Sequence, residues 1–271
     1  MRRATVERAK IAVLLIAISG LGSAYAKASQ RELRVCADGN NLPFSNRKGL
    51  GFENKLAELV ARELNAKLTY TWAAQRRGFI RNTLNAEQCD LIMGVPSAAE
   101  SVLTTRPYYR SSYVFVSRPE APRVDSLDAP QLRKMRIGVP LVGDDGANPA
   151  PLLALASRGL IANVRGYSVY GDYSLESPPA ELLRALRRGD IDLAIAWGPL
   201  AGYYASRGTP RLRVTALREA EAPAGLSFAF DISMATRKGD RELLAELDRI
   251  LERRQHSIAV LLARYSVPVV R

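Results

Sequence analysis

The sequence predicts an α/β protein built from two similar halves, the second inserted into the first. Two observations support this. Short apolar strands alternate with amphipathic helices from residue 33 to residue 95, and the same alternation restarts at residue 135, after a proline-rich stretch at 118–130. Strands joined through helices form right-handed crossovers, so each half is expected to contain a parallel sheet covered on both faces.

In the first half, the β-prone run at 33–37 ends in turn residues at 38–43. The helix predicted over 51–64 places leucine and valine at helical spacing, with charged residues on the opposite face. The remaining expected elements are a strand over 68–72, a helix over 79–84, a strand over 90–95 and a strand over 112–117.

In the second half, the helix predicted over 179–188 ends at Gly189, which fits a left-handed cap, and the buried strand at 191–197 follows. The other expected elements are a strand over 135–140, a turn over 143–146, a helix over 151–157, a strand over 164–170, a last strand over 226–234 and a long helix over 241–265.

The two halves are therefore expected to be connected by crossover strands near 112–118 and 226–234. This predicts one lobe formed by 27–117 with 226–271, and a second lobe formed by 118–225.

Residues 1–26 have the features of a secretory signal. Four basic residues within the first ten precede the apolar run 11–18, and Ala24 and Ala26 provide a small-residue cleavage pattern. The apolar run is too short to span a bilayer, so we expect export to the periplasm without a membrane anchor. In an oxidising compartment Cys36 and Cys89 are expected to form a disulfide, the alternative being two buried thiols.

Charge and histidine content exclude several functions. The chain carries 39 basic and 27 acidic residues and a single histidine, His256. One histidine excludes multi-histidine metal sites and leaves one possible member for a catalytic triad. His256 lies in the predicted C-terminal helix, where a surface or core position is expected.

The positive charge is concentrated on the first lobe, which has 21 basic and 14 acidic residues, whereas the second lobe has 14 basic and 12 acidic residues. This distribution favours a protein partner over nucleic acid.

Several segments resemble a known family. The run 37–57, with Gly-Phe-Glu-Asn-Lys-Leu-Ala at 51–57, resembles type II periplasmic solute-binding proteins, as do 106–109 and 232–240. A narrower resemblance, to MxaJ/XoxJ-type proteins associated with quinoprotein methanol dehydrogenases, is carried by 40–46, 75–85, 103–113, 143–148 and 197–203. It implies a two-lobed binding fold with two interlobe crossover strands. It also implies an accessory role toward a dehydrogenase that uses pyrroloquinoline quinone (PQQ) with calcium or a lanthanide; no cofactor or metal is expected in this chain itself.

The amino-acid site of the transport proteins is missing from this sequence. A closed cleft must neutralise both the carboxylate and the ammonium of an amino acid. The segment 95–101 lacks the arginine of the transport proteins, Trp197 stands where their amine-binding aspartate would be, and Asp144 and Asp145 would repel a carboxylate. Free amino acids are therefore not expected as ligands.

Candidate cleft residues lie where strands end, because ligands of open α/β sheets bind there. Each aromatic residue has core packing as its alternative role, but together they predict a large apolar cleft for an apolar ligand or a partner segment. Asp144, Asp145 and Asp172 could ligate a hard cation, although helix capping explains them without a metal. The candidates are Asp38, Asn41, Phe44, Trp72, Tyr108, Tyr109, Asp144, Asp145, Tyr170, Asp172 and Trp197.

Arg76, Arg77 and Arg81 are candidates for docking an acidic partner, with a solvated helix face as the alternative. Arg77 and Arg81 would share a face if a helix began by Arg77. The sequence thus predicts a non-catalytic accessory protein that binds a quinoprotein methanol or alcohol dehydrogenase. The alternatives are a transporter-coupled binding protein for a neutral or aromatic molecule and, third, a cleft dehydratase.

Overall fold

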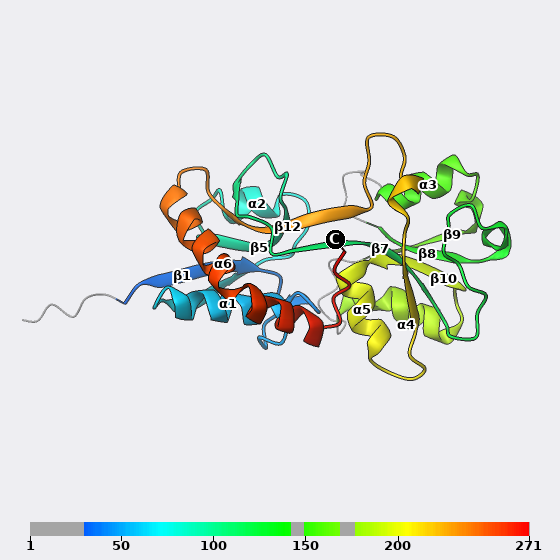
Figure 1. The fold of residues 1–271 in the computed structure, drawn as a ribbon, viewed down its shortest axis with the longest axis horizontal. Helices are drawn as coiled ribbons and strands as arrows, with labels where there is room; N and C mark the ends of the chain where they lie inside the picture. The colour runs from blue at the N-terminus through cyan, green and yellow to red at the C-terminus, as the bar shows by residue number, and fades with distance from the viewer. Residues whose placement is uncertain (1–29, 142–148, 169–176, 271) are drawn as a thin grey trace, which may run out of the picture.

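The protein has a two-lobed α/β fold. The computed structural model describes residues 30–141, 149–168 and 177–270. Figure 1 shows two groups of helices and strands at opposite ends of an elongated molecule, with β7 (Tyr109–Ser117) and β12 (Ala229–Thr236) running between them. This is the predicted fold class, including its two interlobe strands.

The first lobe is centred on β1 (Glu32–Ala37), which pairs in parallel with β4 (Lys67–Trp72) on one side and β5 (Leu91–Pro96) on the other. Helices α1 (Phe52–Glu63) and α6 (Arg241–Arg264) pack on each other and on this sheet. Their apolar stripes cover it because residues one turn apart share a helix face. The short elements are β2 (Asn40–Asn41), β3 (Ser45–Asn46), α2 (Phe79–Asn82) and β6 (Leu103–Thr104).

The second lobe is centred on β8 (Ile137–Leu141), which pairs in parallel with β9 (Val164–Ser168) and β10 (Leu193–Trp197). Alternate residues of β10 enter two separate cores on opposite faces of the sheet. The covering elements are α3 (Ala150–Ser157) in one core and α4 (Glu181–Arg188) and α5 (Gly198–Ser206) in the other. The 3-10 turns are η1 (Pro130–Lys134), η2 (Ile161–Asn163), η3 (Pro178–Ala180) and η4 (Glu219–Glu221).

The interlobe strands join both parallel sheets into one mixed sheet in the order β4-β1-β5-β12-β7-β10-β8-β9. β7 and β12 are antiparallel, with Ser112 opposite Ala229 and Tyr109 opposite Ile232. β7 also pairs with β10 and with β11 (Arg213–Ala216) in the second lobe. The chain therefore crosses twice between the lobes through hydrogen-bonded strands; the residue limits of the lobes stay a prediction.

Both interlobe strands differ from their predicted ranges. β7 begins at Tyr109 rather than near 112, because Arg110 and Asp231 form a cross-strand ion pair of 2.8 Å that extends the ladder. β12 begins at Ala229 rather than at 226, since the amide of Phe228 donates to the Glu219 carboxylate.

Two helices also differ from expectation. The helix predicted over 79–84 spans only Phe79–Asn82, because the Thr83 hydroxyl donates to the Phe79 carbonyl and competes with the next helical hydrogen bond. The unpredicted α5 begins with glycine and proline, which are typical of a turn but are also tolerated in the first helical turn. The predicted left-handed end of α4 at Gly189 is confirmed, with φ of 80°.

A disulfide joins Cys36 and Cys89, whose Cα atoms are 5.6 Å apart, as predicted. Both residues are buried among Leu84, Ile92 and Val95. The bond fastens β1 to the segment that leads into β5. Among the described helices, none combines the length and the apolar character that crossing a bilayer requires.

Candidate functional site

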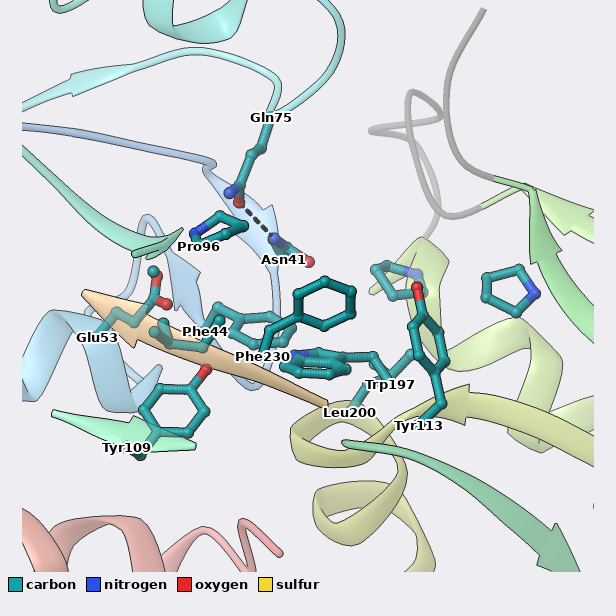
Figure 2. A pocket seen from close by; sticks show the side chains of 14 residues that line it. Asn41, Phe44, Glu53, Gln75, Pro96, Tyr109, Tyr113, Trp197, Leu200 and Phe230 are labelled. Atoms are coloured by element: carbon teal, nitrogen blue, oxygen red, sulfur yellow. Dashed lines mark hydrogen bonds between the residues drawn. The ribbon is translucent and has the colours of Figure 1, made fainter. Parts of the chain in front are cut away.

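A cavity of about 370 Å³ lies between the lobes and is lined by side chains from both. The first lobe, β7 and β12 contribute most of its wall, while β8, η3, β10 and α5 close the other end (Figure 2). The lining residues are Asn41, Phe44, Glu53, Gln75, Gly94, Pro96, Tyr109, Tyr113, Pro140, Pro179, Trp197, Leu200, Phe230 and Ile232.

Five of the fourteen residues that line the cavity are aromatic. Trp197 contacts Tyr113 and Phe230, with ring centroids 5.5 and 5.9 Å apart. Phe44 is supported from behind by the buried Phe52, 5.5 Å away, and Phe52 also packs on Tyr109. Tilted and edge-to-face ring contacts of this kind are favourable beyond the area they bury. The cavity therefore offers rigid ring faces from both lobes.

A polar rim closes one side. The Asn41 side-chain amide donates to Gln75 Oε1 at 3.0 Å, as Figure 2 shows. Asp38 fixes the backbone of this rim, because its carboxylate accepts hydrogen bonds from the backbone amides of Asn40 and Gln75. Across the lobes, the Ser177 amide donates to Asn40 Oδ1 at 3.1 Å. The rim thus connects both lobes at the edge of the cavity.

Glu53 is a buried acid in the cavity wall. Its residue is 6% exposed, and within the described part of the chain no hydrogen bond reaches its carboxyl group. Burial raises the pKa of Glu53 to about 8, because the charged form loses solvation without gaining a partner. The neighbouring Tyr108 and Tyr109 also have raised pKa values, first from burial and then from the charge of Glu53.

Sequence reasoning placed part of this site. Of the candidate cleft residues, Asn41, Phe44, Tyr109 and Trp197 line the cavity. The others that the structure describes lie elsewhere. Asp38 is buried beneath the rim and Tyr108 belongs to the first-lobe core, while Trp72 stacks on Tyr70 with centroids 4.5 Å apart.

Trp72 departs from expectation because it ends an edge strand. The Arg47 guanidinium covers its ring at 5.6 Å, and the ring does not reach the cavity. Asp144, Asp145, Tyr170 and Asp172 lie outside the described residues, so the hard-cation hypothesis stays a prediction. Within the described ranges, no cluster of three acidic, histidine or cysteine side chains could hold a metal.

The sequence interpretation missed Glu53, Gln75, Tyr113 and Phe230. Tyr113 and Phe230 were assigned only to strands, whose alternation does not say which face borders a cavity. A signal existed for Glu53. It precedes Leu56, Ala57 and Val60 at helical spacing and so lies on the apolar stripe of α1, where an acid is unusual.

The candidate docking arginines, Arg76, Arg77 and Arg81, are exposed. Arg81 donates to Asn82, and none of the three forms an ion pair with any residue that the structure describes. Arg77 lies outside α2, which begins at Phe79 after Gly78 with φ of 80°. The condition for a shared helix face of Arg77 and Arg81, a helix that begins by Arg77, is therefore not met, because the left-handed glycine separates Arg77 from the helix.

Only glycine fits at position 94, because the Glu53 carboxyl group occupies the space where a Cβ atom would lie. Gly94 has φ of +67°, and a Cβ built there lies 2.1 Å from Glu53 Oε1. Gly94→Ala is expected to lower the free energy of unfolding by about 2 kcal/mol, through backbone strain and displacement of the carboxyl group. Urea titration measures this change.

Gly159→Ala is the matched control, since Gly159 shares the φ of +67° but an added Cβ there meets no described atom within 4 Å. It is expected to cost about 1 kcal/mol, from backbone strain alone. Equal losses for both variants would contradict the close approach of Glu53.

His256 lies exposed on α6 and does not line the cavity. The lining residues described by the structure include no arginine, lysine or histidine. Glu53 is the only acidic residue among them. The cavity is therefore suited to a ligand with apolar surface and is unsuited to one that carries an unpaired carboxylate.

The two lobes, their paired crossover strands and the cavity between them define a two-lobed binding protein. The chain belongs to the bacterial extracellular solute-binding proteins, family 3, whose model matches residues 33–266. Within this family it is of the MxaJ/XoxJ type, as its sequence motifs predicted.

Three relatives illustrate this similarity. Protein MoxJ of Methylorubrum extorquens is 30% identical over 257 residues, which cover 90% of this chain and 83% of MoxJ. The periplasmic binding protein XoxJ of Methylobacterium extorquens AM1 is 36% identical with a TM-score of 0.72, covering 88% of this chain and 99% of XoxJ. MxaJ of Methlophaga aminisulfidivorans MPT is 25% identical with a TM-score of 0.76, covering 88% and 100%.

Proposed function

We propose that this chain is a non-catalytic periplasmic accessory protein that binds a PQQ-dependent methanol or alcohol dehydrogenase and assists or activates it. The observation that carries the proposal is its similarity to XoxJ and MoxJ over 99% and 83% of their lengths. Proteins of the MxaJ/XoxJ type are associated with quinoprotein methanol dehydrogenases. The dehydrogenase would hold the quinone and its calcium or lanthanide, and this chain would hold neither.

The chemistry of the cavity supports a role other than amino-acid transport. An amino acid would bring a carboxylate into a wall whose described residues include no cationic side chain. Burying that charge without a partner is very unfavourable. The aromatic wall can instead receive an apolar group, whether of a small molecule or of a partner segment.

The docking arginines support an acidic partner. Arg76 and Arg77 are exposed and directly follow Gln75, a lining residue, in the chain. Elsewhere, arginines such as Arg136 and Arg254 are occupied in ion pairs. Arginine is weakly hydrated and suits partly desolvated interfaces.

Binding one conformation of the dehydrogenase more tightly than another would assist the enzyme, although this chain itself would catalyse nothing.

Charge reversal tests this docking surface. Replacing Arg76, Arg77 and Arg81 together with glutamate is expected to weaken binding to the purified dehydrogenase of the same organism by at least about tenfold at low salt. The reversed charges would repel an acidic surface instead of attracting it. Biolayer interferometry across a salt series measures the affinity, and the loss should shrink as salt screens the charges.

The matched control reverses Arg133, Lys134 and Arg211, which are exposed and are in no ion pair with the described residues. It changes the net charge equally, and its affinity should stay within about twofold of wild type.

A second candidate function, carriage of an uncharged or aromatic solute, is favoured by the aromatic cavity. Failure to recover any quinoprotein from periplasm, together with ligand-induced closure, would support that function and overturn the accessory one.

A further inference from the structure

The cavity contains a buried acid, Glu53, whose carboxyl group accepts no hydrogen bond from the described residues. Glu53 projects from the first turn of α1 into the cavity, opposite the second-lobe end formed by Trp197 and Leu200 (Figure 2). We propose that the cavity binds an organic monocation, an alkyl- or arylammonium group that pairs with the Glu53 carboxylate while its apolar part lies against the aromatic wall.

The lack of a partner for Glu53 is the first argument. Its carboxyl group accepts no hydrogen bond from the described chain, although only 6% of the residue is exposed. Burial without a donor keeps the carboxyl group protonated, and buried polar groups in native proteins are nearly always paired. Because the carboxyl lines an open cavity, a ligand can supply the missing partner.

The groups around Glu53 do not supply a positive charge. The charge of Glu53 acts on Tyr109 at the start of β7, on Tyr108 just before it, and on Tyr70 of β4. Burial raises the pKa of all three, so they are neutral near pH 7. Gly94 of β5 approaches from the remaining side and brings no charge.

The aromatic wall favours a cation over an anion or a neutral group. Ring faces carry negative electrostatic potential, and aromatic cages are the usual sites for ammonium ligands. Phe44, Tyr109, Tyr113, Trp197 and Phe230 provide such rings here. An alcohol could hydrogen bond to Glu53 but would gain nothing from the ring potential, and a carboxylate would be repelled.

The size and charge of the cavity restrict the ligand further. About 370 Å³ is within the range of small-molecule sites and accommodates one aromatic ring with a short ammonium arm. The cation should carry no carboxylate, because no cationic side chain among the described lining residues could receive it. An amine, and not an amino acid, fits both conditions.

Binding of a cation must be coupled to a proton. With its pKa raised to about 8, Glu53 is mostly protonated at pH 7 and must ionise to form the ion pair. The affinity should therefore rise by about ninefold from pH 6 to pH 7 and by about fivefold from pH 7 to pH 8, while an alkylammonium, like lysine, keeps its charge. At pH 7 roughly one proton should leave the protein for each ligand bound.

Isothermal titration calorimetry with three probes of one shape tests the proposal. Benzylammonium, benzyl alcohol and benzoate are titrated at pH 6, 7 and 8, each in two buffers that differ in ionisation enthalpy. Benzylammonium should bind at least about tenfold more tightly than the other two at pH 8, with the stated pH dependence and proton release.

Glu53→Gln keeps the shape of the side chain and removes its charge, so it should lose the preference for benzylammonium, the pH dependence and the proton release. Glu58→Gln, which removes an acid that pairs with Lys55 outside the cavity, should behave as wild type. The pH dependence of benzylammonium binding by the wild-type protein tests the proposal without any variant.

Equal affinity for benzyl alcohol and benzylammonium, no binding of any probe, or unchanged binding by Glu53→Gln would each overturn the proposal. The inference does not rest on the proposed function. Calorimetry uses this protein alone, so dehydrogenase binding can fail while amine binding succeeds, and the reverse.

Discussion

Replacing both Cys36 and Cys89 with alanine is expected to lower the free energy of unfolding by about 4 kcal/mol. The disulfide closes a loop across a sequence separation of 53 residues, and most of its stabilisation comes from restricting the unfolded chain. Both residues are also buried in a satellite core with Leu84 and Ile92, so alanine leaves part of their volume empty.

Urea unfolding followed by tryptophan fluorescence measures this loss lobe by lobe. The chain has two tryptophans. Trp72 lies on β4 in the lobe that contains the disulfide, and Trp197 lies at the end of β10 in the other. A Trp197→Phe background therefore reports the first lobe alone. Chemical reduction of the unsubstituted protein should reproduce most of the shift; a loss below about 1 kcal/mol would show that packing, and not the crosslink, holds β1 to β5.

Glu53→Gln is expected to raise the free energy of unfolding by about 3 kcal/mol at pH 7. The pKa of Glu53 is about 8 in the folded protein, against 4.5 for an unperturbed glutamate. Between these values the folded state holds a proton that the unfolded state has released. The stability of the wild type must therefore fall as the pH rises from 4.5 toward 8 and level off above it. Glutamine has no proton to hold, so the variant lacks this decline.

The measurement is urea unfolding at half-unit steps from pH 4 to pH 9. Wild type and Glu53→Gln should have similar stability near pH 4 and diverge progressively up to about pH 8. Glu58→Gln removes one carboxyl from the same helix outside the cavity and serves as the control. Parallel pH profiles for wild type and Glu53→Gln would show that the Glu53 carboxyl is solvated rather than buried.

Local patterns predicted most of the long elements, though not α5, and three of the five aromatic residues that line the cavity. Leucine and valine at helical spacing identified α1 and α6, and Gly189 marked the end of α4. Phe44 and Trp197 were placed at the cavity because each follows a strand, and strand ends meet at one edge of a sheet. The same rule misplaced Trp72, since an edge strand can turn its last side chain outward beneath Arg47.

The sequence by itself predicted the two-lobed fold, the interlobe strands and the disulfide pair, and its comparison with the transport proteins indicated that the amino-acid anchors are missing. Each of these depends on residue type and spacing, which a linear pattern records. Only the tertiary structure decided that Glu53 faces an aromatic cavity without a hydrogen-bond partner among the described residues, and that Tyr113 and Phe230 complete the wall. The reason is physical: the apolar stripe of α1 indicates that Glu53 points inward, but it does not say what Glu53 meets there. The burial that raises the Glu53 pKa arises from packing by strands distant in the chain.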